Sequence, residues 1–279
     1  ASLGCQKVVF TTAFLSSGIE HTTSLQAINE LFTQAEASNI QLGLMVNRLI
    51  IESEWDTFIK ELEAITLEIP DFFVVSDVGV LYYLSLHTQK EIIFHSDTTI
   101  ANVYDAEMLL NHGASTIMPA RELTFDKKLE IARAHPTQTL LPLFGYQIMS
   151  KSYRPLLTNY FKEIDKAYPS KFEPYYFKEE RRDHYYIGYE DDHGFCMFTH
   201  KIVHLFDEKE DLEKIGLTYG WMDTNFVDEN MIEIAISYFH DIISKEDMYT
   251  EFAKKNQESL LDHGLNMQDT TLVKEKDDE

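Results

Sequence analysis

The sequence predicts an α/β protein, a (β/α)8 barrel of the TIM type, and two observations lead to this prediction. Short apolar runs rich in β-branched and aromatic residues recur along the first half of the chain, at intervals of roughly 20–30 residues that suit a strand and its crossover helix. Between these runs, apolar residues follow the three- and four-residue spacing of a helix. Strands that read as continuous apolar runs are typical of parallel sheets, which helices cover on both faces. In such a barrel the reactive groups lie at the carboxyl ends of the strands.

Six strands and five helices are expected before residue 150. The predicted strands are Lys7–Ala13, Gln41–Asn47, Asp71–Asp77, Glu91–Asp97, Ser115–Arg121 and Thr139–Gln147. The predicted helices are Ser24–Ser38, Glu52–Thr66, Val80–His87, Val103–Asn111 and Phe125–Ala134. Two of these helices carry stop signals, a glycine at Gly113 and a proline at Pro136.

The alternation breaks after residue 150. We expect an insertion over residues 150–205, with a helix at Leu156–Ala167 and a β-hairpin whose strands are Tyr185–Glu190 and Phe195–Val203. The remaining elements are expected at Glu208–Ile215 (helix), Leu217–Asp223 (strand) and Glu229–Ile243 (helix), within residues 206–260, and residues 261–279 as a solvated tail. Residues 1–279 would thus form a single barrel domain. Seven strands are one fewer than the barrel needs, and Ala1 follows what reads as the end of a helix, so the first strand is expected to be lacking.

Composition limits the partners and the compartment. Asp and Glu outnumber Lys and Arg by 47 to 24, and the formal charge of −23 repels free nucleic acid. The two cysteines, Cys5 and Cys196, are too few for a disulfide framework and do not form a C-x-x-C pair. No apolar run approaches the ~20 residues of a membrane span. The sequence therefore predicts a cytoplasmic protein that does not bind membranes.

Polar side chains end the predicted strands with unusual regularity. The candidate ligand-binding residues, with Arg154 just beyond the last of the six strands, are Asn47, Asp77, Ser96, Arg121, Glu122, Gln147, Arg154 and Asp223. An arginine at the mouth of an acidic barrel favours a small anionic ligand, because a guanidinium group holds a carboxylate or phosphate through two hydrogen bonds. Two other interpretations stay open. Asp77 and Asp97 both precede helices and suit an N-cap, and Arg121 could form an internal ion pair with Asp77, Asp97 or Glu122.

Familiar catalytic motifs are absent from the sequence. It has no G-x-S-x-G, H-E-x-x-H, G-x-x-x-x-G-K-[ST] or G-x-G-x-x-G pattern. Cys196 lies in the predicted hairpin with no general base nearby in the sequence, so a small buried side chain is the favoured interpretation. No catalytic residue can be named, and we expect neither a metal nor another cofactor.

The middle of the chain resembles the peptidase U32 family, the collagenase-like proteases. The resemblance rests on the run HSDTTIANVYDAEMLLNHGASTIMPARELTFDKK and on FGYQIMSKSYRPLLTNYF, which is similar to the family's signature from Gly145 through Arg154 to Thr158. The signature cysteines fall on Ile148 and Pro155 here, and residues 159–182 contain no cysteine. The thiolates that larger relatives use for an iron–sulfur cluster are therefore missing. The chain most resembles the short, cluster-free subunit type of some Gram-positive bacteria.

This resemblance implies different functions. One is proteolysis, with the chain as a U32 hydrolase. Another is hydroxylation of the wobble uridine of tRNA, in which this chain would be a subunit without a cluster, next to a longer cysteine-rich U32 paralogue that brings the tRNA. A third is a non-catalytic scaffold or binding barrel.

Overall fold

The computed structural model of the protein describes residues 3–263 apart from residues 66, 68, 169 and 182. Its first half alternates strands and helices, and the six strands and five helices expected before residue 150 are confirmed. In chain order the elements are β1 (Lys7–Phe10), α1 (Leu25–Ala37), β2 (Gln41–Val46), α2 (Trp55–Ala64), β3 (Phe72–Val75), α3 (Val78–His87), β4 (Glu91–His95), α4 (Val103–Asn111), β5 (Thr116–Met118), α5 (Phe125–Ala134) and β6 (Leu140–Gly145), with a 3-10 turn at Glu52–Glu54.

Strands β1 to β5 form one parallel sheet in the order of the chain. A parallel bridge between Ile117 and Thr139 leads from β5 toward β6, which pairs in parallel with β12 (Tyr219–Met222). The chain therefore has a mixed α/β fold with parallel strands. Because these seven strands run in the same direction, their carboxyl ends lie on one side of the molecule.

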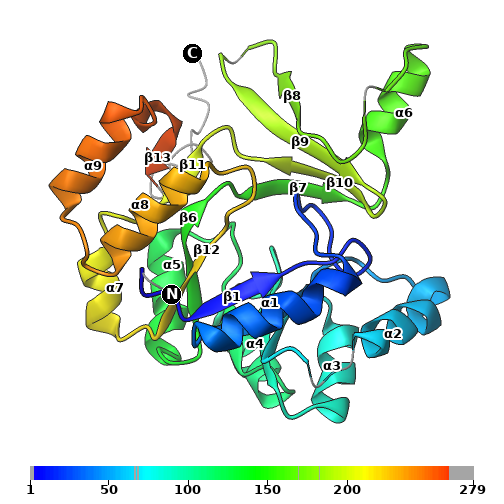
Figure 1. Ribbon diagram of the computed structural model, residues 1–279, viewed down its shortest axis with the longest axis horizontal. Coiled ribbons are helices and arrows are strands. Elements are labelled where there is room, and N and C mark those ends of the chain that lie inside the picture. The colour runs from blue at the N-terminus through cyan, green and yellow to red at the C-terminus, as the bar shows by residue number, and fades with distance from the viewer. Residues whose placement is uncertain (1–2, 66, 68, 169, 182, 264–279) are drawn as a thin grey trace, which may run out of the picture.

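Successive side chains of a strand point to opposite faces, and here they enter two different cores. One set, which includes Phe73, Val75 and Phe94, packs with buried residues of the surrounding helices. Figure 1 shows α1 to α4 on the outside of these strands. The other set consists of Met45, Phe72, Val74, Ile93, Met118 and Leu140, which pack together with Val9, Tyr219 and Trp221. Side chains of β1 and β12 thus belong to the same core.

The second half of the chain begins with an antiparallel sheet. Its strands, in spatial order, are β7 (Ile148–Ser152), β10 (Gly194–Phe198), β9 (Tyr185–Asp191) and β8 (Tyr175–Lys178), and we call them the insertion sheet. The remaining elements are α6 (Leu156–Glu163), β11 (Ile202–His204), α7 (Lys209–Ile215), α8 (Glu229–Phe239), α9 (Lys245–Lys254), a 3-10 turn at Glu258–Leu260 and β13 (Leu261–His263). In Figure 1 the insertion sheet lies above the parallel strands, with α6 at its outer side.

Two buried carboxylates fix the insertion sheet. Asp191 accepts a hydrogen bond from Gly18 N at 2.6 Å, which joins the hairpin to the loop after β1. Glu190, fully buried, accepts from the backbone N–H groups of Leu157 at 2.7 Å and Thr158 at 3.1 Å. Both donors belong to the first turn of α6, where the N–H groups have no partner within the helix.

The predicted hairpin is confirmed, but the long strand Phe195–Val203 is wrong. The chain leaves the sheet after Phe198 because Thr199 bonds across to Gln147, with N–H donating to Gln147 O at 2.8 Å and Oγ1 accepting from Gln147 N at 3.1 Å. The predicted helices Leu156–Ala167 and Glu229–Ile243 end earlier, at Glu163 and Phe239. β13 occupies the first three residues of the predicted tail and pairs with β11, and the rest of that tail lies outside the described residues.

Among the residues that the structure describes, no helix combines the length and the apolar character needed to cross a membrane.

Candidate ligand-binding cleft

A cleft of about 860 Å³ opens at the carboxyl ends of the parallel strands. This volume lies within the range of small-molecule sites, which are roughly 300–1,000 Å³. Residues that follow β2, β3, β4, β5, β6 and β12 line it, and β7 of the insertion sheet adds a further wall. Seven of the eight predicted site residues belong to the lining: Asn47, Asp77, Ser96, Arg121, Glu122, Gln147 and Asp223.

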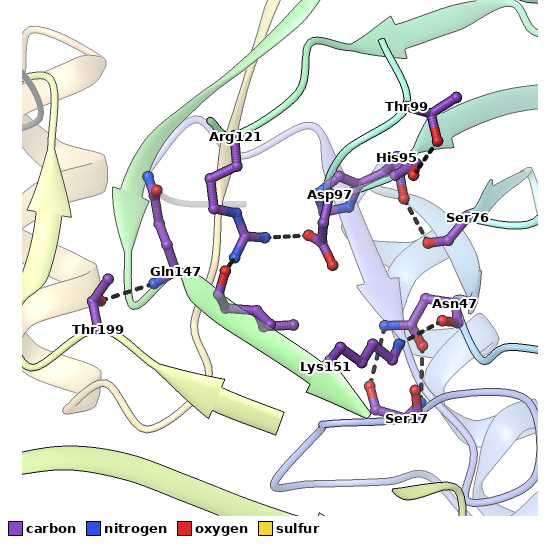
Figure 2. Close-up of polar contacts among 12 residues, drawn as sticks. Ser17, Asn47, Ser76, His95, Asp97, Thr99, Arg121, Gln147, Lys151 and Thr199 are labelled. Carbon is purple, nitrogen blue, oxygen red and sulfur yellow. Dashed lines mark hydrogen bonds and ion pairs between the residues drawn. The ribbon is translucent and has the colours of Figure 1, made fainter. Parts of the chain in front are cut away.

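Arg121 joins the parallel strands to the insertion sheet. Its Nη2 forms an ion pair with Asp97 Oδ1, and its Nη1 donates to the backbone oxygen of Ile148 in β7 (Figure 2). The backbone N–H of Arg121 also donates to Asp97 O at 2.9 Å. The internal ion pair that the sequence left open therefore exists, with Asp97 as its partner. The Arg121 side chain is 20% exposed, and the residue lines the cleft.

Asn47 holds a neighbouring part of the cleft wall in place. Its side chain makes two hydrogen bonds with the backbone of Ser17, at 2.9 and 3.2 Å, and so ties the end of β2 to the loop after β1. The backbone oxygen of Asn47 accepts from Lys151 Nζ at 2.8 Å. Lys151 comes from β7, and Figure 2 shows it reaching across the cleft toward Asn47. The side-chain amide of Asn47 is thus used structurally, while Lys151 brings a second cation.

His95 and Asp223 lie at the inner end of the cleft and have strongly shifted pKa values. Burial lowers the pKa of His95 to about 4, so its ring is neutral at pH 7. Burial raises the pKa of Asp223 to about 6, against the hydrogen bond from Asn225 N at 3.0 Å, which favours the carboxylate. Gly145 makes this position of Asp223 possible, since at its φ of +134° a Cβ atom would lie 2.3 Å from Asp223 O.

The other predicted residues contribute in different ways. Asp77 is the N-cap of α3, accepting from Gly79 N at 2.7 Å and Val80 N at 3.1 Å, as the capping interpretation predicts. The same interpretation is wrong for Asp97, because the N-cap of α4 is Asn102. Ser96 Oγ lies 2.7 Å from Thr99 Oγ1. Gln147 holds Thr199 through its backbone, and Glu122 is exposed at the cleft.

Arg154 lies outside the cleft. After β7 the chain turns at Ser152, whose Oγ accepts from Arg154 N at 3.1 Å, and α6 begins at Leu156. The side chain of Arg154 is exposed. Lys151 and Lys128 line the cleft instead. One feature of the sequence could have indicated that Lys128 is buried. It lies three residues after Phe125, on the face of α5 that the apolar residues occupy.

The Cys196 thiol is not available as a nucleophile. Cys196 is 2% exposed and burial raises its thiol pKa to about 12, so the thiolate is scarce at pH 7. The prediction that Cys196 is a small buried side chain is therefore confirmed. Within the described part of the chain, no group of three or more His, Cys, Asp or Glu side chains is arranged to hold a metal ion.

Comparisons with known proteins agree with the family resemblance. The sequence model of Peptidase family U32 matches residues 16–270. The tRNA hydroxylation protein P2 of Bacillus subtilis (strain 168) is 28% identical over 148 residues, which are 51% of this chain and 48% of that protein. The chain thus spans about half the length of this relative.

Two solved structures are similar at low sequence identity. The U32 peptidase Mk0906 has a TM-score of 0.42 at 11% identity, over 51% of this chain and 62% of that chain. The chitinase from Chromobacterium violaceum ATCC 12472 has a TM-score of 0.40 at 11% identity, over 84% and 90%.

Proposed function

The chain belongs to peptidase family U32, and from this premise we propose that it serves in tRNA modification rather than in peptide hydrolysis. Its proposed role is that of a subunit without an iron–sulfur cluster in the hydroxylation of the wobble uridine, acting beside a longer cysteine-rich U32 paralogue. The name of its relative, tRNA hydroxylation protein P2, supports this role. Because the chain covers 48% of that relative, the activity, the substrate and the partner are all parts of the proposal.

The observation that carries the proposal is the gathering of cations in the cleft of an acidic chain. Arg121, Lys128 and Lys151 line it together with the carboxylates Asp77, Asp97, Glu122 and Asp223, so cations are more frequent in the cleft than in the whole chain, where Asp and Glu outnumber Lys and Arg about two to one. Ammonium and guanidinium groups within one cleft attract a carboxylate or a phosphate. The seven predicted site residues of the cleft are proposed to surround the ligand, with Arg121 binding its anionic group, from a small molecule or from RNA.

Peptide hydrolysis finds less support in the same cleft. The Cys196 thiol is buried, and Ser96 Oγ faces Thr99 Oγ1 rather than a base. His95 is neutral, but its ring lies against Trp221 at 5.0 Å between centroids. A nucleophile needs a base within hydrogen-bonding distance. Among the described residues, the contacts of Cys196, Ser96 and His95 given above include no such nucleophile–base pair.

The distribution of charge supports contact with RNA outside the cleft. Residues 150–205 contain nine Lys and Arg and nine Asp and Glu, so the formal charge of −23 belongs entirely to the rest of the chain. Five of the seven exposed aromatic side chains of the described residues also lie there: Tyr153, Tyr160, Phe172, Tyr176 and Tyr185. A neutral surface with exposed rings is where the bases of single-stranded RNA could stack.

The closure of the strands into a barrel and the domain boundaries are also parts of the proposal. We propose that the seven parallel strands curve into a (β/α)8-type barrel, with residues 150–205 as its insertion and residues 1–279 as one domain. The core shared by β1 and β12 supports this curvature, as does Lys7 Nζ, which lies 4.7 Å from the ring centroid of Tyr219. We also propose a cytoplasmic location, since tRNA is the proposed substrate.

Nucleoside mass spectrometry of tRNA from a deletion strain tests the function. Loss of hydroxylated wobble uridine, with recovery when the wild-type gene is returned, is expected. An unchanged nucleoside profile in the deletion strain would rule out the tRNA role. Co-purification with the longer paralogue tests the partner separately.

A further inference from the structure

Lys128 is a buried cation without a described counterion. The side chain is 8% exposed and lines the cleft together with Arg121, Phe125, Pro142 and Leu205. No carboxylate of the described residues pairs with its ammonium group, and after burial the guanidinium of Arg121 is the next influence on its pKa, which falls to about 8. A lysine buried this far is rare unless its charge is paired.

The position of Lys128 on its helix adds a second unfavourable interaction. α5 begins at Phe125, with Thr124 as its N-cap, so Lys128 lies in the first turn. The partial positive charge of a helix N-terminus disfavours a cation there and favours an anion. Helical side chains also lean toward the N-terminus, which for α5 is the end beside Arg121 and the cleft.

Burial, a neighbouring guanidinium and the helix N-terminus thus all disfavour the charged amine in the free protein. A bound anion would offset all three, because it would pair with Lys128, approach Arg121 and meet the helix end. Arg121 is itself paired with Asp97, whereas no carboxylate of the described residues pairs with Lys128.

We propose that Lys128 and Arg121 form a subsite for the acidic group, a carboxylate or a phosphate, of a small molecule that enters the cleft. This rests on the proposed function, because it deepens the role of the same cleft. A free small molecule is favoured over an RNA phosphate because Lys128 as a residue is only 8% exposed, and a backbone phosphate in a polymer reaches such a position poorly.

Two lysines on α5 provide a matched pair of variants. Lys128→Met keeps the length and packing of the side chain and removes an unpaired buried charge, so the variant should be at least as stable as the wild type. Lys127→Met is the control, since Lys127 is 58% exposed and pairs with Glu130 on the surface.

Pyridoxal 5′-phosphate is a suitable probe for this subsite. Its phosphate tests the anion site. Its aldehyde carbon is attacked by the lone pair of a neutral amine, and the adduct loses water to give an imine, which borohydride reduces to a stable secondary amine. With its pKa lowered to about 8, Lys128 is more often unprotonated at pH 7.5 than an ordinary lysine.

We expect the peptide that contains Lys128 to be labelled at least about tenfold faster than exposed lysines, because its pKa of about 8 raises the neutral fraction at pH 7.5 roughly two hundredfold. Inorganic phosphate should slow the labelling. Lys127→Met should label like the wild type and Lys128→Met should lose the fast phase. Labelling spread evenly over exposed lysines, or unaffected by phosphate, would overturn the subsite. Protection by an RNA oligonucleotide but not by inorganic phosphate would overturn the choice of a small molecule.

These results do not depend on the tRNA profile of the deletion strain. A labelled Lys128 with an unchanged tRNA profile would support the subsite and refute the proposed function. Loss of the hydroxylated uridine in the deletion strain without fast labelling of Lys128 would refute the subsite and support the proposed function.

Discussion

Folding makes the carboxyl group of Asp223 harder to ionise. Its pKa rises to about 6 from the usual 3.8 because it is buried at the end of β12. A carboxyl group with a raised pKa in the folded state stabilises the protein while protonated. Its contribution is therefore fully present below about pH 4 and is lost as the pH rises through about 6.

Asp223→Asn should remove this pH dependence. Asparagine keeps an oxygen that can accept from Asn225 N but carries no charge, so the variant should gain stability over the wild type by about 1–3 kcal/mol between pH 4 and pH 7. Urea denaturation at several pH values measures the difference. A difference that stays constant with pH would show that Asp223 ionises as easily in the folded protein as in the unfolded chain.

The cleft residues differ in how far the sequence could predict them. Charged residues at strand ends could be predicted, because the carboxyl ends of parallel strands meet on one side. The pairing of Arg121 with Asp97 could not be predicted. Asp77, Asp97 and Glu122 all lie at or next to strand ends, and the sequence does not distinguish among them. Lys128 and Lys151 were missed because one lies on a helix and the other on a short polar strand, away from the strand ends where the search began.

At the scale of elements, α6 depends on a residue far away in the sequence. Pro155 occupies the N-cap position of α6, and its side chain makes no capping hydrogen bond. Glu190 of β9 replaces that cap by accepting from Leu157 N, Thr158 N and Thr158 Oγ1. A carboxylate at a helix N-terminus is favoured both by the free N–H groups and by the helix dipole.

Glu190→Ala should destabilise the protein by about 2–3 kcal/mol, because it leaves buried N–H donors without a partner. Thermal or urea denaturation measures the loss, and proteolysis should cut near α6 first. Glu163→Ala, at the exposed end of the same helix, is the control and should change stability by less than about 0.5 kcal/mol. Equal effects of the two substitutions would refute the capping role of Glu190.

Elements that local residues determine could be predicted from the sequence, and elements that depend on distant residues could not. Strands β1 to β6 could be predicted because their apolar runs are buried on both faces by helices. β7 and β8 could not: β7 reads Ile-Met-Ser-Lys-Ser, and most of its side chains face the cleft or solvent. The end of β10 was set by Thr199 bonding to Gln147 across 52 positions, a contact that no local pattern reports.

At the scale of the molecule, the insertion sheet offers a surface unlike the rest of the chain. Tyr176 pairs with Ile187 and Lys178 with Tyr185 across β8 and β9, so Tyr176, Lys178 and Tyr185 share one face of the sheet. Both tyrosines are nearly 60% exposed. Lys178 Nζ lies 6.0 Å from the ring centroid of Tyr185.

The double variant Tyr176→Ala/Tyr185→Ala should weaken binding of single-stranded RNA by about tenfold or more, since stacking contributes roughly 1–3 kcal/mol per base. Fluorescence anisotropy with a labelled RNA measures it. Tyr82→Ala/Tyr104→Ala removes the two exposed tyrosines of α3 and α4 and should leave the affinity unchanged. If both double variants bind alike, the insertion sheet is not the RNA surface.

The central claim is that the cleft around Arg121 serves tRNA modification. Nucleoside mass spectrometry of tRNA tests it most directly, in the deletion strain supplied with wild type, Arg121→Met or the surface control Lys127→Met. Arg121→Lys, which keeps the charge without the planar pair of donors, distinguishes charge from bidentate binding. Purified Arg121→Met must first give a cooperative melting transition, because it loses the ion pair with Asp97.

The account predicts that wild type and Lys127→Met restore the hydroxylated wobble uridine, and that a folded Arg121→Met does not. Restoration by Arg121→Met to the wild-type level would contradict the account, because Arg121 would then serve only to join the strands to β7.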